Sequence, residues 1–170
     1  MRQIVSMKRL LLSILFFLIS FIGFSQSLEI VGIAKDGARG VAGATISLIK
    51  DGVVVETRAT SSNGRFLFYL EYGSDYEIRI EKDGYVLLTA EVDGSLPDVA
   101  TPEDLTMDFY INMIAQPKSG NEYSFDKPVA KVNFQLDIYG FDTDLDYEDM
   151  ITDEIRELEQ KIREEDKAFE

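Results

Sequence analysis

Apolar and polar residues alternate along most of the chain between Leu28 and Val92, and glycine-bearing turns divide this stretch into short runs. A period of two is typical of β-strands that bury one face, and short strands about 8–12 residues apart favour a β-sandwich or a barrel. The Asp51-Gly52 pair directly joins two of the runs and predicts a tight hairpin. The runs that we expect to form strands are residues 28–35, 43–50, 53–60, 65–71, 75–81 and 85–92.

Two neighbouring runs carry a row of large apolar side chains. The row consists of Phe66, Phe68 and Leu70 in the first run and Tyr76, Ile78 and Ile80 in the second. Charged residues such as Glu77 and Arg79 take the opposite face, as in an antiparallel sheet with one face in water. We therefore predict that the row belongs to the core and is not a ligand platform.

The alternation returns after Val92. Residues 94–104 form a linker with Pro and Asp, and 105–115 alternate again and predict a strand that closes the sandwich. After a loop over 116–128, residues 129–141 predict one further strand that extends the sheet. Its inward row is Ala130, Val132, Phe134, Leu136 and Ile138.

From Leu145 the spacing of apolar residues changes to the three-and-four pattern of an amphipathic helix. Asp144 is suited to cap it, and acidic residues follow in the first turn. Such a helix needs a surface to pack on, so we expect it either to dock on its own sandwich or to bind another protein. The residues predicted to bind a partner are Ile151, Ile155, Leu158 and Ile162.

These patterns predict an all-β fold: an Ig-like or transthyretin-like antiparallel β-sandwich of about seven strands with a C-terminal amphipathic helix. We divide the chain into residues 26–115 for the sandwich, 116–141 for the loop and additional strand, and 142–170 for the acidic helix. Residues 1–25 precede these parts.

Residues 1–25 have the layout of a secretory signal peptide. Arg2, Lys8 and Arg9 precede an apolar run over 10–24, and Gly23 and Ser25 offer small residues for cleavage. The alternative is an uncleaved membrane anchor, but the run is shorter than the ~20 residues of a spanning helix. We therefore expect a periplasmic or secreted protein with no stable membrane insertion.

Charge narrows the range of partners. Residues 1–25 hold three basic and no acidic side chains, so their removal changes the formal charge from −14 to −17. A field of this sign repels nucleic acid and anionic lipid, and we expect neither as a partner.

The chain also contains no Cys and no His. This composition excludes disulfides, Cys/His or Ser/His nucleophiles and ordinary zinc sites. Catalysis would have to use carboxylates, Lys or Tyr, and the sequence shows no general-base constellation of these residues, so we expect no enzyme and no cofactor.

The acidic stretch before the helix is the best candidate for a metal site. Asp142, Asp144, Asp146 and Asp153 occupy positions one, three, five and twelve of a calcium-loop pattern. However, Tyr147 stands where the loop needs Gly, and position twelve is Asp in place of the usual Glu. We therefore predict no metal and keep calcium as an alternative.

Sugar binding by outward-facing tyrosines is another alternative, and the candidates are Tyr69, Tyr72, Tyr110 and Tyr139.

Residues 32–85 resemble the carboxypeptidase regulatory-like domain. The resemblance is carried by "GIAKDG", "GVAGATISLIKDG", "TSSNGRFLFYL" and "YEIRIEKDGY", which match the order of strands and turns in that family. The family is related to transthyretin-like and collagen-adhesin B-type sandwiches. The resemblance covers about a third of the chain and implies a non-catalytic module of exported or surface proteins of Gram-negative bacteria.

The sequence thus predicts a non-catalytic exported module that is structural or binds another envelope or secreted protein. The helical stripe is the first docking route, and strand addition at an exposed sheet edge is the second. The alternative function is a carbohydrate- or calcium-binding module.

Overall fold

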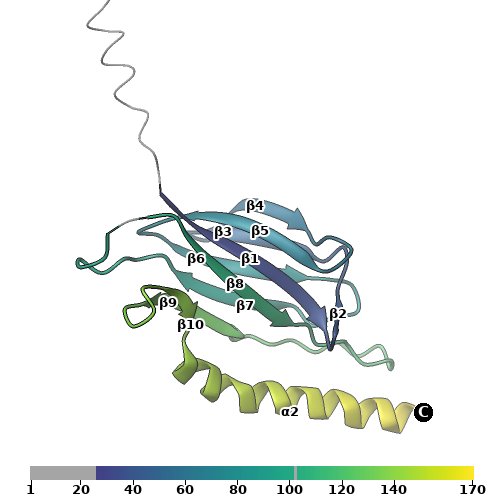
Figure 1. Ribbon diagram of the computed structural model, residues 1–170. Coiled ribbons are helices and arrows are strands. Elements are labelled where there is room, and N and C mark those ends of the chain that lie inside the picture. Colours follow the sequence, from purple (N-terminus) through teal and green to yellow (C-terminus); the bar gives the residue numbers. More distant parts are fainter. Residues whose placement is uncertain (1–25, 102) are drawn as a thin grey trace, which may run out of the picture.

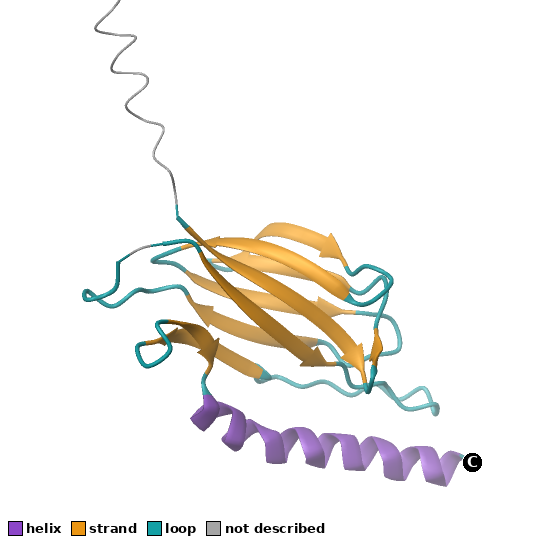
Figure 2. Cartoon of the chain, viewed as in Figure 1, coloured by secondary structure: helices purple, strands orange, loops and turns teal. Residues whose placement is uncertain are grey.

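The structure, a computed structural model, describes residues 26–101 and 103–170. The predicted signal peptide lies outside these residues. The described chain forms two facing β-sheets and one long C-terminal helix (Figures 1 and 2). None of its helices has the length and apolar character needed to cross a membrane.

The first sheet, sheet A, is built around its central strand β1. Its strands are β1 (Ser27–Asp36), β2 (Arg39–Gly40), β5 (Arg65–Glu71) and β8 (Leu105–Asn112). β5 and the short β2 pair with β1 in antiparallel orientation, whereas β8 pairs with it in parallel.

The second sheet, sheet B, is wider and has the order β10-β9-β7-β6-β3-β4. Its strands are β3 (Thr45–Lys50), β4 (Val53–Ala59), β6 (Asp75–Glu81), β7 (Leu88–Asp93), β9 (Ala130–Gln135) and β10 (Gly140–Thr143). The predicted sandwich and C-terminal helix are both confirmed.

The core lies between the two sheets. The predicted row is inside it, since every residue of that row is buried. Phe68 and the aliphatic residues around it are fully removed from water, which supplies most of the driving force for closing the sandwich. The largest completely buried side chains include Leu28, Ile30, Ile46, Phe68, Ile78 and Ile80.

The Asp51-Gly52 hairpin between β3 and β4 is confirmed. Asp51 and Gly52 have φ angles of 52° and 75°, and Lys50 pairs with Val53. Two consecutive residues with positive φ define the turn whose twist matches that of the flanking strands. The pairing shifts between Leu48 and Ile49, so β4 carries a bulge near its start.

Not all strands pair as the sequence suggested. β1 with β8 and β7 with β9 are parallel pairs, because the loops before β8 and β9 carry the chain across the fold before each new strand begins. The predicted strand 85–92 begins regular pairing at Leu88. Tyr85 forms an isolated bridge with Ala115 instead.

The prediction of one strand over 129–141 is wrong. β9 ends at Gln135, and a turn that includes Tyr139 at φ 49° leads into β10. Leu136 and Ile138, predicted to face inward, are 58% and 55% exposed. The turn brings Phe141 back to the core, where its ring is buried and lies edge-on to Phe134 at 5.5 Å between ring centroids. The alternating pattern simply continues through the turn.

The helix α2 (Leu145–Phe169) begins as predicted. The Asp144 side chain accepts a hydrogen bond from the backbone N–H of Tyr147 at 3.0 Å, which satisfies one of the unpaired donors of the first turn. Figure 1 shows that α2 runs along one open side of the sandwich, below β8, β9 and β10.

Gly32 gives a test of core packing. The Phe66 ring lies against this glycine, and a Cβ at Gly32 would be 2.0 Å from Cζ of Phe66. We expect Gly32→Ala to lower the free energy of unfolding by about 3 kcal/mol in urea denaturation, because the ring has to leave its buried position. Gly37→Ala is the control, because its Cβ meets no atom within 4 Å at φ 57°. It should lose about 1 kcal/mol through backbone strain alone. Equal losses in both variants would contradict the packing described.

Candidate functional site

The apolar stripe of α2 packs on the protein's own sandwich. Ile151, Leu158 and Ile162 are buried, and Ile155 is partly buried against the core. This is the first of the two arrangements that the sequence left open. While the helix is docked, the four side chains predicted to bind a partner are covered by the chain itself, and their role in partner binding stays a prediction.

Polar contacts hold the C-terminal half of α2 to the loop over 116–128. The Glu165 carboxylate accepts hydrogen bonds from the Ser119 hydroxyl, from Asn121 Nδ2 at 2.6 Å and from the Tyr123 hydroxyl at 2.6 Å. We name these four residues the Glu165 cluster. Bonds from Ser119 and Tyr123 lower the pKa of the Glu165 carboxyl, because they stabilise its charged form.

Further contacts extend this attachment along the loop. The Lys118 backbone N–H donates to Asp166 Oδ1 at 2.8 Å, and Lys127 Nζ pairs with Glu154 at 2.6 Å. The Tyr147 hydroxyl donates to the Pro128 carbonyl at 2.7 Å. The helix is therefore fixed at both ends.

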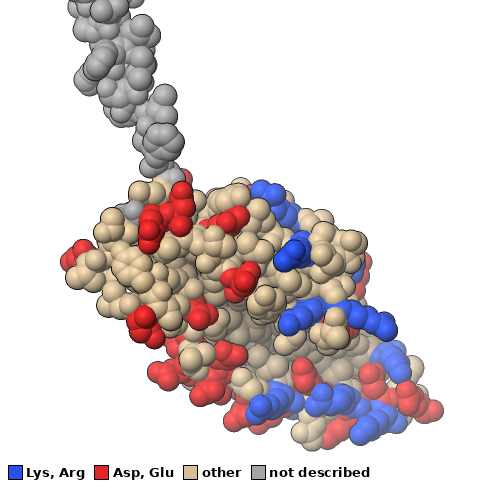
Figure 3. All heavy atoms as spheres, viewed as in Figure 1, with Lys and Arg blue, Asp and Glu red and all other residues tan. Residues whose placement is uncertain are grey.

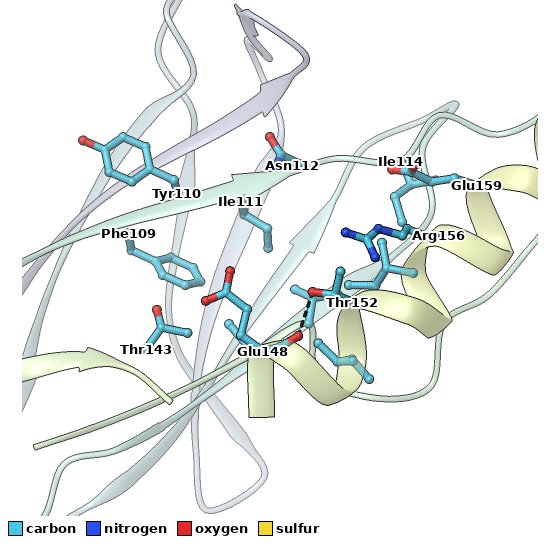
Figure 4. Close-up of a pocket in the computed structure, with 14 residues that line it drawn as sticks. Phe109, Tyr110, Ile111, Asn112, Ile114, Thr143, Glu148, Thr152, Arg156 and Glu159 are labelled. Atoms are coloured by element: carbon cyan, nitrogen blue, oxygen red, sulfur yellow. Dashed lines mark hydrogen bonds between the residues drawn. The ribbon is translucent and has the colours of Figure 1, made fainter. Parts of the chain in front are cut away.

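A groove remains between β8 and the N-terminal half of α2. It has a volume of about 350 Å³. Figure 4 shows Phe109 and Ile111 of β8 on one side and Glu148, Thr152 and Arg156 of α2 on the other. The Thr152 hydroxyl donates to the Glu148 carbonyl at 2.7 Å, so this side chain is held against its own helix.

The strand wall of the groove is the free edge of β8. Four consecutive residues, 109–112, line the groove, which places the strand's edge and not one of its faces there. Among the described strands, β8 pairs with β1 alone. The Met113 backbone N–H bonds to the Lys35 carbonyl at 2.7 Å. Because backbone groups alternate in direction along a strand, those of Tyr110 and Asn112 point away from β1, toward the groove.

The groove has the parts that a bound strand requires. Unpaired backbone groups of β8 offer hydrogen bonds, and Ile111 and Ile155 offer apolar contact between the two walls. Charged side chains of both signs lie on the helix wall, where Arg156 also pairs with Asp153 at 3.1 Å. The arrangement suits recognition of an extended polypeptide segment. Sequence analysis predicted the strand but could not show that its edge is free.

The four aspartates of the calcium hypothesis take separate structural roles. Asp142 lies in β10 and accepts from the Thr143 N–H at 2.7 Å, whereas Asp144 caps α2. Asp146 is in the first helical turn, and Asp153 pairs with Arg156. In the part of the chain that the structure describes, no three acidic side chains are grouped to hold a metal ion.

The four tyrosines of the sugar-binding hypothesis also lie in different parts of the structure. Tyr69 and Tyr110 are each 56% exposed, and both lie on the outer face of sheet A. Tyr72 stacks on Phe141 at 6.0 Å, and its hydroxyl donates to the Glu103 carbonyl at 2.6 Å. Tyr139 is in the turn before β10, where its hydroxyl accepts from the Thr101 N–H at 2.7 Å. Two of the four therefore share one surface.

That outer face of sheet A carries both apolar and charged side chains, since Asp108 lies beside Val31 and Lys35 Nζ lies 4.9 Å from the centroid of the Tyr110 ring. Val31, Ile33 and Leu67 lie there, partly buried, between the two tyrosines. Figure 3 looks onto this side of the molecule and shows acidic residues mainly on the left and basic residues mainly on the right, with both signs mixed along the lower edge. The Tyr69 pKa is raised, mainly because the neighbouring Glu29 carboxylate disfavours a second negative charge.

Comparisons with known proteins return no matching family model and no matching curated sequence. Similar solved structures include 3-chlorocatechol 1,2-dioxygenase from Rhodococcus opacus 1CP (12% identity, TM-score 0.38, 52% of this chain and 60% of that one). Catechol 1,2-dioxygenase from Acinetobacter sp. ADP1 is similar at 10% identity and TM-score 0.45, over 64% of this chain and 59% of that one. A C-terminal fragment of the pilus adhesin SpaC from Lactobacillus rhamnosus GG is similar at 17% identity and TM-score 0.38, over 54% and 46%.

The chain spans less than two thirds of each of these three proteins. At such identities and scores the likeness carries no chemistry from one protein to another. The dioxygenases therefore do not support an enzymatic role here. The sandwich itself is established by the strands and their pairing.

The Glu165 cluster gives a test of helix docking. The lowered pKa means that the carboxylate contributes stability above the ordinary carboxyl pKa and loses that contribution as the pH falls through the lowered value. We expect Glu165→Gln to reduce the melting temperature near neutral pH, and the difference from the unmodified protein to shrink with acidification. Circular dichroism melts across the acidic range measure this.

Glu157→Gln is the matched control, because Glu157 is an exposed residue of the same helix. This variant should show no comparable pH-dependent difference. The same pH dependence in both variants would show that overall charge, and not the Glu165 cluster, is responsible.

Proposed function

We propose that the protein is a non-catalytic β-sandwich module that binds another protein by accepting an extended segment along the free edge of β8. The observation that carries this proposal is the groove between β8 and α2, with the backbone groups of Tyr110 and Asn112 directed into it. A partner strand in this position adds to sheet A and is covered by the helix on its other side.

The helix makes this edge more selective than an open one. A segment in the groove has to fit between Ile111 and Ile155 and to match the charges of Glu148 and Arg156. Main-chain hydrogen bonds supply affinity, and the side-chain contacts supply the choice of partner.

We further propose that the module is exported and acts in the periplasm or outside the cell, in a bacterial envelope assembly. The basic, apolar and small residues of 1–25 support export. The family-like segments over 32–85 support a carboxypeptidase regulatory-like module, since they fall in order on the strands from β1 to β6 and the turn before β7.

Peptide selection tests the proposal. A phage-displayed library of linear peptides is selected on the immobilised protein, and the selected sequence is synthesised. We expect the bound peptide to slow amide hydrogen exchange at Tyr110 and Asn112, because those N–H groups become donors to a new strand. Exchange that slows elsewhere and stays fast at these two amides would contradict the proposal.

Two variants of Tyr110 separate the backbone from the side chain. Tyr110→Pro removes an N–H on the free edge and keeps the pairing with β1, so peptide affinity should fall by about tenfold or more, about 1.4 kcal/mol. Tyr110→Ala removes the exposed ring and keeps the N–H, so affinity should stay within about threefold. A larger loss in the Ala variant than in the Pro variant would point to the outer face of sheet A.

Carbohydrate binding is the second candidate, and the shared exposure of Tyr69 and Tyr110 on sheet A favours it. Such a site would stack sugar rings on the two aromatic faces. A glycan array distinguishes the candidates, because a sugar ligand should be lost in Tyr69→Ala and in Tyr110→Ala, whereas the groove peptide should still bind both variants.

A further inference from the structure

Strand β4 is a free edge strand of sheet B. It is the outermost strand on the side away from α2, and among the described strands it pairs with β3 alone. Its residues are exposed on both faces except Glu56, which is half-buried. Val53, Val54 and Val55 are 63%, 52% and 53% exposed. Long exposed edges of β-branched residues favour pairing with a further strand.

The direction of the free backbone groups follows from the end of the strand. The Thr60 N–H bonds to the Ala44 carbonyl at 2.9 Å, and the Gly43 N–H bonds to the Thr60 carbonyl at 3.0 Å. Thr60 therefore directs its backbone toward β3. Because this direction alternates, Arg58 does the same, whereas Thr57 and Ala59 direct their N–H and C=O groups to the open edge.

The charged residues of β4 lie on the inner face of the sheet. Glu56 pairs with Leu48, and Arg58 pairs with Ile46, and both aliphatic partners belong to the core. The Arg58 guanidinium lies 6.0 Å from the centroid of the Phe68 ring. Arg58 Nε also donates to Glu56 Oε1 at 2.6 Å, so an acid and a base stand two residues apart along an open edge.

We propose that the occupant of this edge is a second copy of the chain, paired antiparallel through β4 with Thr57 on the two-fold axis. In this register Thr57 exchanges backbone hydrogen bonds with its counterpart, and Val55 lies opposite Ala59. Glu56 then lies opposite Arg58 of the second copy, and this pair occurs twice. The strand is thus complementary to itself in both charge and backbone direction.

Neighbouring registers lack this match. An axis on Glu56 or Arg58 would place like charges opposite each other and use backbone groups directed toward β3. An axis on Val55 leaves Arg58 opposite Gly52 and Glu56 opposite Val54. The bulge near Val55 ends the regular stretch there, so the contact stays short. A two-fold contact of this kind is closed and gives a dimer, not a fibre.

Charge reversal tests the proposed dimer in sedimentation velocity over a range of protein concentrations. The unmodified protein should show a concentration-dependent monomer–dimer equilibrium. Glu56→Arg alone and Arg58→Glu alone should each weaken the dimer about tenfold or more, because each places like charges opposite each other twice. The double variant should restore it, and an equimolar mixture of the two single variants should form a mixed dimer.

Glu77→Arg is the matched control. Glu77 and Arg79 form the same acid-and-base pair two residues apart, at 2.9 Å, on β6 in the interior of the sheet. This variant should dimerise like the unmodified protein. A protein that stays monomeric at every concentration would overturn the proposal. So would single variants that dimerise normally, or a mixture that forms no mixed dimer.

Discussion

The unequal width of the two sheets determines most of this structure. In the described residues, sheet A has three long strands, β5, β1 and β8, whereas sheet B has six, so sheet A cannot cover all of sheet B. Apolar surface that is left uncovered costs free energy in proportion to its area. On one side of the sandwich α2 covers the excess with Ile151, Leu158 and Ile162. On the other side β4 extends beyond β5, and its inner face carries Glu56 and Arg58 in place of apolar residues.

The part of sheet B that sheet A does not cover is therefore treated differently at the two sides of the sandwich. The helix side is covered by hydrophobic contact and fixed by the hydrogen bonds of the Glu165 cluster, yet a groove remains between β8 and the N-terminal half of α2. The β4 side remains in water, with charged residues that prevent burial of the face and a backbone edge that can still pair. Each proposed interaction uses the backbone edge that its side leaves open.

Local patterns in the sequence were sufficient to predict most of the strands, the hairpin at Asp51-Gly52 and the start of the helix at Asp144. These features depend on residues that are close together in the chain. The turn between β9 and β10 was missed, because Leu136 and Ile138 continue the alternation although they lie outside the core. The two parallel strand pairs were missed as well, since alternation assigns a residue to a face but does not name the neighbouring strand.

The candidate site was less accessible to prediction for the same reason. The stripe of α2 was visible in the sequence, but whether it meets its own sandwich depends on a match between surfaces far apart in the chain. The groove needs β8 to be an edge strand and α2 to lie beside it, and neither fact has a local signal. The aspartates before the helix show the opposite, a local pattern in the sequence that does not form a site in the structure. Their spacing resembled a calcium loop, and the fold distributes Asp142, Asp144 and Asp153 over a strand, a cap and a helix.

The central position of β1 has a mechanical consequence. Ser27 begins this strand at one end of the molecule, and Figure 1 shows the C-terminal end of α2 near the opposite end. A pull on Ser27 along the strand loads β1 directly, and β1 is bonded to β5 on one side and to β8 on the other. The load is then shared by both ladders in shear, so that many bonds have to break together and not one after another. A tethered copy of this domain would resist stretching far better than a hairpin opened from its end.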